Sequence, residues 1–165
     1  DLGIHKADLM NYLLDDTIVS AMAITGTLDK KNTDGTPITV DDNAICIYQT
    51  KKGAVGTMEV SWTCYGEEDK STVLYGSEGC LKINADPRYP LVLEKKSGER
   101  IFYNIDKYGA TTNGSGIIDT WISCLKNQMP PSISGDSSFE SMKAVFAALE
   151  SAQKGHLVRV EDLQI

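Results

Sequence analysis

Residues 54–63 constrain the fold of this chain more strongly than any other segment, because their side chains alternate in character along the stretch. The positions that share one side of an extended strand are small or apolar: Gly56, Met58, Val60 and Trp62. The positions between them are polar: Thr57, Glu59, Ser61 and Thr63. Alternation with a period of two residues is typical of an antiparallel sheet with one packed face and one polar face. The segment therefore predicts a half-buried sheet in the middle of the chain.

Further strands are predicted on both sides of this segment. Apolar and β-branched runs bounded by turn residues predict strands over residues 17–25, 42–50, 71–75, 80–84, 91–95 and 101–105. A polar surface loop is expected over residues 30–37. Pro87 and Pro90 interrupt the run between two strands, so that link is expected to be a loop or a sheet edge.

Apolar residues recur at helical spacing in three other segments. The first, residues 4–14, precedes the strands, and the second, residues 117–125, ends before a pair of prolines. The third is expected to begin at a capping box formed by Ser137 and Glu140 and to stop at Gly155, before a short strand over residues 157–160. This order predicts one α+β domain over residues 1–165, an open-faced, mainly antiparallel β-sheet with helices packed on one face.

Composition excludes several classes of function. The net charge is −7 and there is no basic stripe, which argues against a nucleic-acid partner. No apolar run approaches the roughly 20 residues that a membrane helix requires, so no membrane association is expected. Four widely spaced cysteines form no C-x-x-C pair and no zinc-type pattern. We expect them to be buried free thiols in a reducing, cytoplasmic environment.

Asp1 and His5 are the strongest candidates for chemistry. Four residues apart on a helix, they lie on one face, where a carboxylate can orient an imidazole and stabilise its charged form. The alternative is an ordinary helix end, with Asp1 beside the helix dipole and His5 in solvent. Asp8 belongs either to the same cluster or to a salt bridge. A metal site built from these three residues ranks last, because three ligands on so short a helical segment converge poorly.

Two other features favour structure over chemistry. The turn over residues 76–79 is followed by a strand and not by the helix that phosphate cradling needs, so its glycines are interpreted as turn residues. Trp62 and Tyr65 could line a pocket or simply pack, and packing is favoured for Trp62. No G-x-G-x-x-G unit follows a strand and opens a helix, so the chain carries no dinucleotide-binding fingerprint.

Several motifs, taken in order, resemble the C-terminal domain of the Gfo/Idh/MocA oxidoreductases. They are Asp1-x-Gly3-x-His5-x-x-Asp8, Asp41-Asp42-x-Ala44, Gly53-Ala54-x-Gly56-x-x-Glu59-x-Ser61-Trp62, Tyr75-Gly76-x-Glu78-Gly79 and Ser151-Ala152-x-x-Gly155. The Asp-x-Gly-x-His opening is the most specific of them. The resemblance extends over nearly the whole chain.

The resemblance implies a role for each candidate. His5 would be the acid/base that takes a proton from the substrate hydroxyl, and Asp1 would hold its ring. Asp8, Trp62 and Tyr65 are further candidates for substrate contact. The family's Rossmann domain, which binds NAD or NADP and carries a catalytic lysine, is expected upstream of Asp1, so this chain alone is expected to be inactive and to bind no cofactor or metal.

The sequence thus predicts the substrate and oligomerisation domain of an NAD(P)-dependent oxidoreductase. Its substrate would be a sugar, polyol or related hydroxylated compound, and its open sheet face would form a homo-oligomer. The alternative hypothesis is a non-catalytic assembly or ligand-binding module that uses the sheet as a dimer interface.

Overall fold

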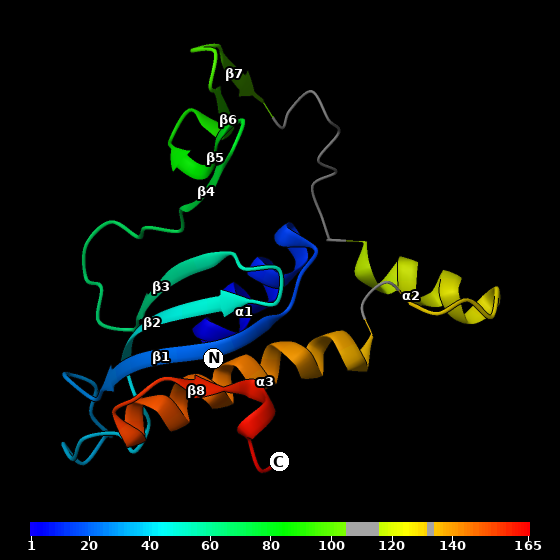
Figure 1. Ribbon diagram of the computed structural model, residues 1–165. Helices are drawn as coiled ribbons and strands as arrows, with labels where there is room; N and C mark the ends of the chain where they lie inside the picture. Colours follow the sequence, from blue (N-terminus) through cyan, green and yellow to red (C-terminus); the bar gives the residue numbers. More distant parts are fainter. Residues whose placement is uncertain (105–115, 132–133) are drawn as a thin grey trace. The chain divides into compact units, whose positions relative to one another are not determined.

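The computed structural model describes residues 1–104, 116–131 and 134–165 (Figure 1). These residues divide into two compact units, one formed by residues 1–64 together with 127–165 and the other by residues 65–126. The described elements are helices and antiparallel strands. The predicted α+β class is confirmed.

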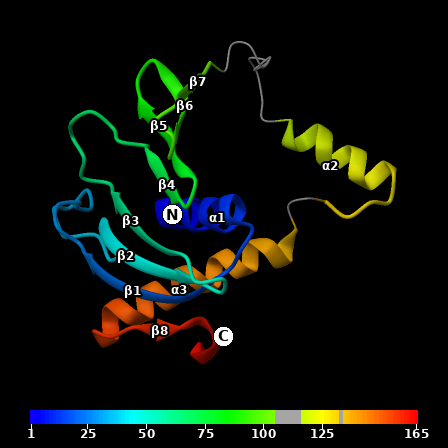
Figure 2. The same cartoon turned by 45° about the horizontal axis from the view of Figure 1, so that its top comes forward.

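The first unit contains most of the helical structure. Its elements are α1 (Leu2–Leu14), β1 (Ile18–Gly26), β2 (Asn43–Thr50), β3 (Val55–Ser61), α3 (Gly135–Lys154), β8 (Val158–Arg159) and the short 3₁₀ helix η2 (Val160–Asp162). The strands form one antiparallel sheet in the order β3-β2-β1-β8. Both helices pack against this sheet, α3 mainly along β1 and α1 against β3 (Figures 1 and 2).

Small residues allow α3 to approach the sheet closely. Ala144, Ala147 and Ala148 on the helix are buried in the same core as Ala21 and Ala23 of β1. Alanine loses no side-chain entropy in a helix and leaves little volume between helix and strand, so the two backbones can pack tightly. This alanine-rich contact forms the centre of the core of the first unit.

The opposite face of the sheet is apolar and exposed. Met22 and Ile24 of β1 pair with Ile47 and Ile45 of β2, and the exposed fractions of these four side chains range from 45% to 76%. The alternation predicted for β3 is confirmed, since Thr57 is exposed on this face. On β1 and β2, however, the face expected to be polar carries aliphatic side chains.

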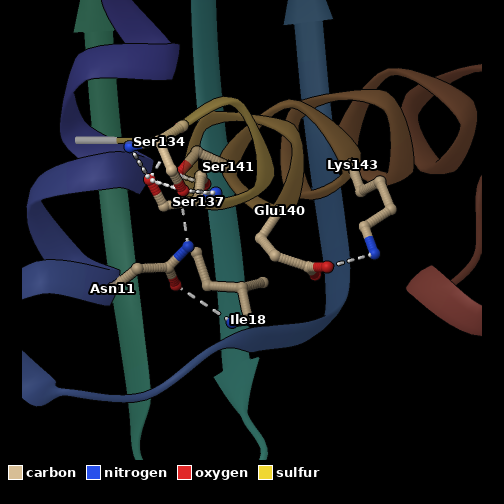
Figure 3. Close-up of polar contacts among 7 residues, drawn as sticks. All are labelled: Asn11, Ile18, Ser134, Ser137, Glu140, Ser141 and Lys143. Atoms are coloured by element: carbon tan, nitrogen blue, oxygen red, sulfur yellow. Dashed lines mark hydrogen bonds and ion pairs between the residues drawn. The ribbon is translucent and has the colours of Figure 1, made fainter. Parts of the chain in front are cut away.

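Helix α3 begins one turn earlier than predicted. Ser134 is the N-cap residue, its Oγ accepts from the Ser137 N–H at 3.2 Å, and the Ser134 N–H donates to the Ser137 Oγ at 3.2 Å (Figure 3). The predicted capping box of Ser137 with Glu140 is therefore wrong. Glu140 forms an ion pair with Lys143 at 2.7 Å instead. Ser134 and Ser137 each have a possible capping partner three residues later, so the sequence allows either one to be the N-cap. Starting at Ser134 places Asp136 in the first turn of the helix, where a negative charge is favourable.

The predicted C-terminal stop of α3 is confirmed. Gly155 is the C-cap residue with a left-handed backbone conformation, φ 71°. Its N–H donates to the Ser151 carbonyl at 2.8 Å. Glycine adopts this conformation without the steric cost that a Cβ imposes.

The second unit contains a sheet of its own. Its elements are β4 (Thr72–Gly76), β5 (Gly79–Asp86), β6 (Tyr89–Lys95), β7 (Arg100–Tyr103) and α2 (Ile117–Lys126). The strands pair antiparallel in the order β4-β5-β6-β7. The expectation of one continuous sheet is thus wrong, because the described strands form two four-stranded sheets. Ile105, placed in the last predicted strand, lies outside the described residues.

The proline-containing link is tighter than expected. A turn joins β5 directly to β6, and Pro90 lies inside β6. The pairing of these strands is irregular between Ile83 and Asp86, so Pro90 falls outside the regular register, where a missing N–H costs little.

Gly79 is needed for the close approach of β5 and β6, since a Cβ there would lie 2.3 Å from the Glu94 carbonyl oxygen.

The four cysteines are free thiols, as predicted. The expected burial is confirmed for Cys46 in β2, whereas Cys80 and Cys124 are half-buried and the expectation is wrong for Cys64, which is exposed just after β3. Among the described residues, no helix combines the length and the hydropathy needed to cross a membrane.

Candidate functional site

A cavity of about 460 Å³ opens at one end of the first unit. The first turn of α1, the end of β1, the start of β2, the end of β3 and one side of α3 surround it. The polar residues that line it are Asp1, Thr25, Thr39, Asp41, Asp42, Asn43, Ser61 and the phenol-bearing Tyr48. Its apolar lining includes Val40, Met58, Trp62, Val145 and Leu149.

Asp1 and His5 both lie in the N-terminal part of α1. Asp1 is the N-cap residue, is exposed, and lines the cavity. Its side chain makes no capping hydrogen bond, so the carboxylate is left for other partners. His5 is exposed one helical turn further along and does not belong to the cavity lining. In the part of the chain that the structure describes, no hydrogen bond or ion pair joins these two side chains.

Asp42 is the most strongly engaged carboxylate at the cavity. Its side chain is 3% exposed and accepts three consecutive backbone N–H groups, from Leu28 at 2.8 Å, Asp29 at 2.9 Å and Lys30 at 2.8 Å. The side-chain amide of Asn43 donates to it as well, at 2.8 Å. These bonds attach the loop between β1 and β2 to the start of β2, beside the cavity wall.

The same hydrogen bonds keep Asp42 ionised. Burial by itself raises the pKa of the carboxyl group, but the three backbone N–H donors and the Asn43 amide lower this pKa by more. The net pKa lies well below its usual value. Asp42 therefore contributes a permanent negative charge at the wall of the cavity.

A hydrogen-bond network continues from Asp42 along the polar wall. The Asn43 amide also donates to the Thr63 hydroxyl at 3.0 Å, and the Thr63 and Ser61 hydroxyls lie 3.0 Å apart. Residues held by such a network keep their positions when a ligand binds, which lowers the entropic cost of binding. The polar side of the cavity is thus preorganised.

Tyr48 lines the cavity from β2 and is 1% exposed. Among the described residues, its hydroxyl has no hydrogen-bond partner. Burial raises the pKa of Tyr48, and the adjacent Cys46 thiol adds to this rise. Burial also raises the pKa of Cys46. Both groups are therefore neutral, and among the described residues the buried phenol lies beside the Cys46 thiol, a weak acceptor, and donates to no oxygen or nitrogen.

Of the three further candidates, only Trp62 lies at the cavity. Its side chain is 39% exposed and lines the wall, so the packing interpretation is incomplete. Tyr65 is 75% exposed and belongs to the second unit.

Asp8 contacts α3 and does not line the cavity. Its Oδ1 accepts from the Ser141 hydroxyl at 2.7 Å. Asn11, one turn along α1, donates to the same hydroxyl at 3.3 Å and accepts from the Ile18 N–H at 3.0 Å (Figure 3). In this structure Asp8 therefore helps to join the two helices.

Comparison with known proteins identifies the family. A family model described as "GFO/IDH/MocA C-terminal domain" matches residues 1–82. The chain belongs to this family. The matched residues of this GFO/IDH/MocA domain include Asp1, Asp41 and Asp42, which line the cavity, and also His5, which does not.

Two curated relatives match nearly the whole GFO/IDH/MocA domain. A myo-inositol 2-dehydrogenase from Thermotoga maritima is 22% identical over 168 residues, which cover 99% of this chain and 49% of the relative. A D-apiose dehydrogenase from Paraburkholderia graminis is 24% identical over 177 residues, which cover 99% of this chain and 45% of the relative. The chain thus spans about half the length of the curated relatives it matches.

Solved structures support the fold. A levoglucosan dehydrogenase in complex with NADH superposes with a TM-score of 0.81 at 22% identity and covers all of this chain and 50% of its own. An oxidoreductase from Agrobacterium radiobacter in complex with NAD⁺, L-tartaric acid and magnesium superposes with a TM-score of 0.76 at 21% identity over 98% of this chain and 48% of its own. At these identities the likeness establishes the fold of the GFO/IDH/MocA domain.

The described residues of the GFO/IDH/MocA domain do not fit a dinucleotide or a metal ion. Every pair of neighbouring strands is antiparallel, whereas dinucleotide binding in a Rossmann unit needs parallel strands joined by a helix. In the same ranges, no group of three or more His, Cys, Asp or Glu side chains could hold a metal.

Sequence reasoning missed most of the polar cavity wall. The sequence places Asp41 and Asp42 in a family motif without indicating a role for either, and no sequence pattern singles out Thr25, Thr39 or Asn43. The available signal is an acidic residue directly before a strand, at the end of a polar loop. Its significance depends on the backbone of residues 28–30 folding back toward it, which no local pattern reveals.

Proposed function

We propose that the chain is the substrate-binding and oligomerisation domain of an NAD(P)-dependent oxidoreductase. Its substrate would be a sugar, polyol or related hydroxylated compound, oxidised or reduced by hydride transfer. The main support is that the family match includes Asp1 and His5 while Asp1 also lines the cavity. The relatives named as myo-inositol 2-dehydrogenase and D-apiose dehydrogenase support the substrate class. We treat residues 1–165 as one functional domain.

In this proposal His5 carries the proton. When the substrate is an alcohol, hydride leaves the carbon and the hydroxyl must lose its proton to a base. His5 is exposed in the N-terminal part of α1 and directly follows Ile4, which lines the cavity, so the proposal requires a bound substrate to extend from the cavity toward it. Asp1 precedes it by one helical turn and would orient the imidazole and stabilise its protonated form.

The nicotinamide cofactor in this proposal is supported by two solved structures of similar proteins. The solved levoglucosan dehydrogenase contains NADH, and the Agrobacterium radiobacter oxidoreductase contains NAD⁺. Because the described residues lack parallel strands, we assign the cofactor to a part of the whole protein outside them. This chain would supply the proton acceptor and the walls of the substrate site.

A matched pair of histidine variants tests the catalytic role. In the full-length protein, His5→Ala should lower kcat for polyol oxidation about 100- to 10,000-fold, the usual contribution of a general acid or base. His156→Ala is the control, because His156 is the other histidine, is exposed and does not line the cavity. Unchanged turnover after His5→Ala would exclude the catalytic role.

The open sheet face supports the oligomerisation part of the proposal. Met22, Ile24, Ile45 and Ile47 form adjacent cross-strand pairs, and a contiguous apolar surface of this kind is typical of an interaction site. We expect Ile45→Lys to dissociate the oligomer in sedimentation experiments. Ile165→Lys is the control, since Ile165 is 66% exposed outside the sheet. A monomeric parent protein would contradict this part.

A second candidate function would use the same apolar sheet face without catalysing a reaction. The same apolar surface would suit a non-catalytic assembly module, or a binding module that holds a ligand in the cavity without converting it. Ligand binding and oligomerisation that persist without turnover, for every cofactor and substrate tried, would favour this alternative.

A further inference from the structure

We infer that the cavity selects uncharged hydroxylated ligands and rejects their phosphorylated or carboxylated counterparts. This inference rests on the proposed function, and it narrows the substrate class to neutral polyols and sugars. The observations that carry it are the charges on the cavity wall, the hydrogen-bonding groups fixed there and the unpaired phenol of Tyr48.

All charged side chains that the described residues of this chain contribute to the cavity lining are acidic. Asp1, Asp41 and Asp42 line it, and none of its lining residues is lysine, arginine or histidine. Phosphate and carboxylate ligands are normally bound by cationic side chains, often bidentately by arginine. Here an anionic ligand would meet negative charges, one of them fixed in place by four hydrogen bonds on Asp42.

The N-terminus of α1 could in principle attract an anion, because helix N-termini carry a partial positive charge. Asp1 removes this attraction. It is the N-cap residue, its carboxylate makes no capping bond, and it therefore puts a negative charge of its own at the helix end. The partial positive charge of the α1 N-terminus is thus already compensated by the carboxylate of Asp1, which lines the cavity.

Neutral hydroxyl groups match the rest of the lining. Carboxylate oxygens accept hydrogen bonds from sugar hydroxyls, and the Ser61 hydroxyl offers a further polar contact, held in place by the network that the Asn43 amide forms with Asp42 and Thr63. Trp62 provides an aromatic wall for the C–H faces of a ring. Among the described residues the buried Tyr48 hydroxyl has only the weakly accepting Cys46 thiol beside it and no oxygen or nitrogen acceptor, so a nearby ligand oxygen or ligand-bound water could accept from it.

The test uses sets of ligands that differ only in charge. The full-length protein would be given glucose, glucose 6-phosphate and glucuronate, and then myo-inositol and myo-inositol 1-phosphate, with turnover measured for each. Binding would be measured separately through the indole NMR signal of Trp62. We expect each neutral compound that binds to do so at least tenfold more tightly than its charged analogues, with kcat/KM differing in the same direction.

An Asp41→Asn variant probes the cause of the selectivity. Removing this charge should reduce the preference for the neutral member of a pair about threefold to tenfold, as expected for one like-charge interaction near a protein surface. Asp15→Asn is the control, because Asp15 is an exposed carboxylate at the other end of α1 that does not line the cavity. An equal effect of the two variants would show that selectivity comes from net charge and would overturn the inference.

The outcomes separate this inference from the proposed function. Preferential binding of the phosphate or carboxylate, or no binding of any neutral compound, overturns the inference whether or not turnover occurs. Binding of neutral compounds without turnover supports the inference and contradicts the proposed oxidoreductase activity. Turnover with a preference for anionic substrates supports the oxidoreductase and overturns the inference.

Discussion

Ser151 is the side chain whose removal should most clearly weaken the first unit. Its hydroxyl accepts from the Ala23 N–H of β1 at 3.1 Å and donates to the His156 carbonyl at 2.7 Å. The side chain is buried, 1% exposed. One hydroxyl on α3 therefore bonds both to the central part of β1 and to the segment that leads into β8.

The expected cost of Ser151→Ala follows from these two bonds. An unpaired buried N–H at Ala23 would cost about 1–3 kcal/mol, and the partly buried carbonyl of His156 would lose a bond worth about 1 kcal/mol. We therefore expect the free energy of unfolding to fall by about 2–4 kcal/mol.

Urea unfolding followed by tryptophan fluorescence measures this change. A Trp121→Phe background leaves Trp62, in the first unit, as the reporter, because the chain contains two tryptophans. The control is Ser138→Ala on the same helix, where an exposed hydroxyl donates to the Ser134 carbonyl at 3.1 Å. This control should change stability by no more than about 0.5 kcal/mol. Equal effects of the two substitutions would refute the assignment of Ser151 as a link between helix and sheet.

Three further predictions concern other parts of the fold. Gly79→Ala should destabilise the second unit by about 1–3 kcal/mol, because its Cβ would overlap the carbonyl of Glu94, whereas Gly76→Ala, with 3.6 Å of clearance, should be tolerated in the same thermal melt. Tyr48→Phe should raise the free energy of unfolding by about 1 kcal/mol, because it removes a buried hydroxyl without a partner, and a loss of stability in urea would contradict this. The pKa of Asp42 is lowered on folding, so its contribution to stability is complete above the ordinary value of 3.8 and is lost as the pH falls below that value. Asp42→Asn should therefore be less stable at neutral pH and show a weaker dependence of stability on pH below 4, and an acid limb as steep as that of the unmodified protein would exclude this role for Asp42.

Local patterns were sufficient to predict most of the secondary structure. The alternation over residues 54–63, the β-branched run that became β1 and the apolar spacing of α1 each report on one strand or one helix, and each element was found within a few residues of its predicted position. Gly155 was recognised as the stop of α3 because a left-handed backbone conformation leaves a direct mark in the sequence. The predicted start of α3 is wrong because Ser134 and Ser137 are equally good caps by sequence, and the structure uses Ser134.

Only part of the candidate site could be predicted from such local patterns. Asp1 and His5 could be predicted as a pair because they are four residues apart at the start of one helix, and such short spacing can be recognised from the sequence alone. The wall that they adjoin depends on long-range contacts: Asp42 became a buried, ionised anchor only because residues 28–30 turn back onto it. The division of the strands into two sheets depends on strand pairing. The side of β1 and β2 that is left open to solvent depends on which face of the sheet α3 covers. Residue periodicity specifies what each segment can form, whereas burial and charge at a site come from segments far apart in sequence that pack together.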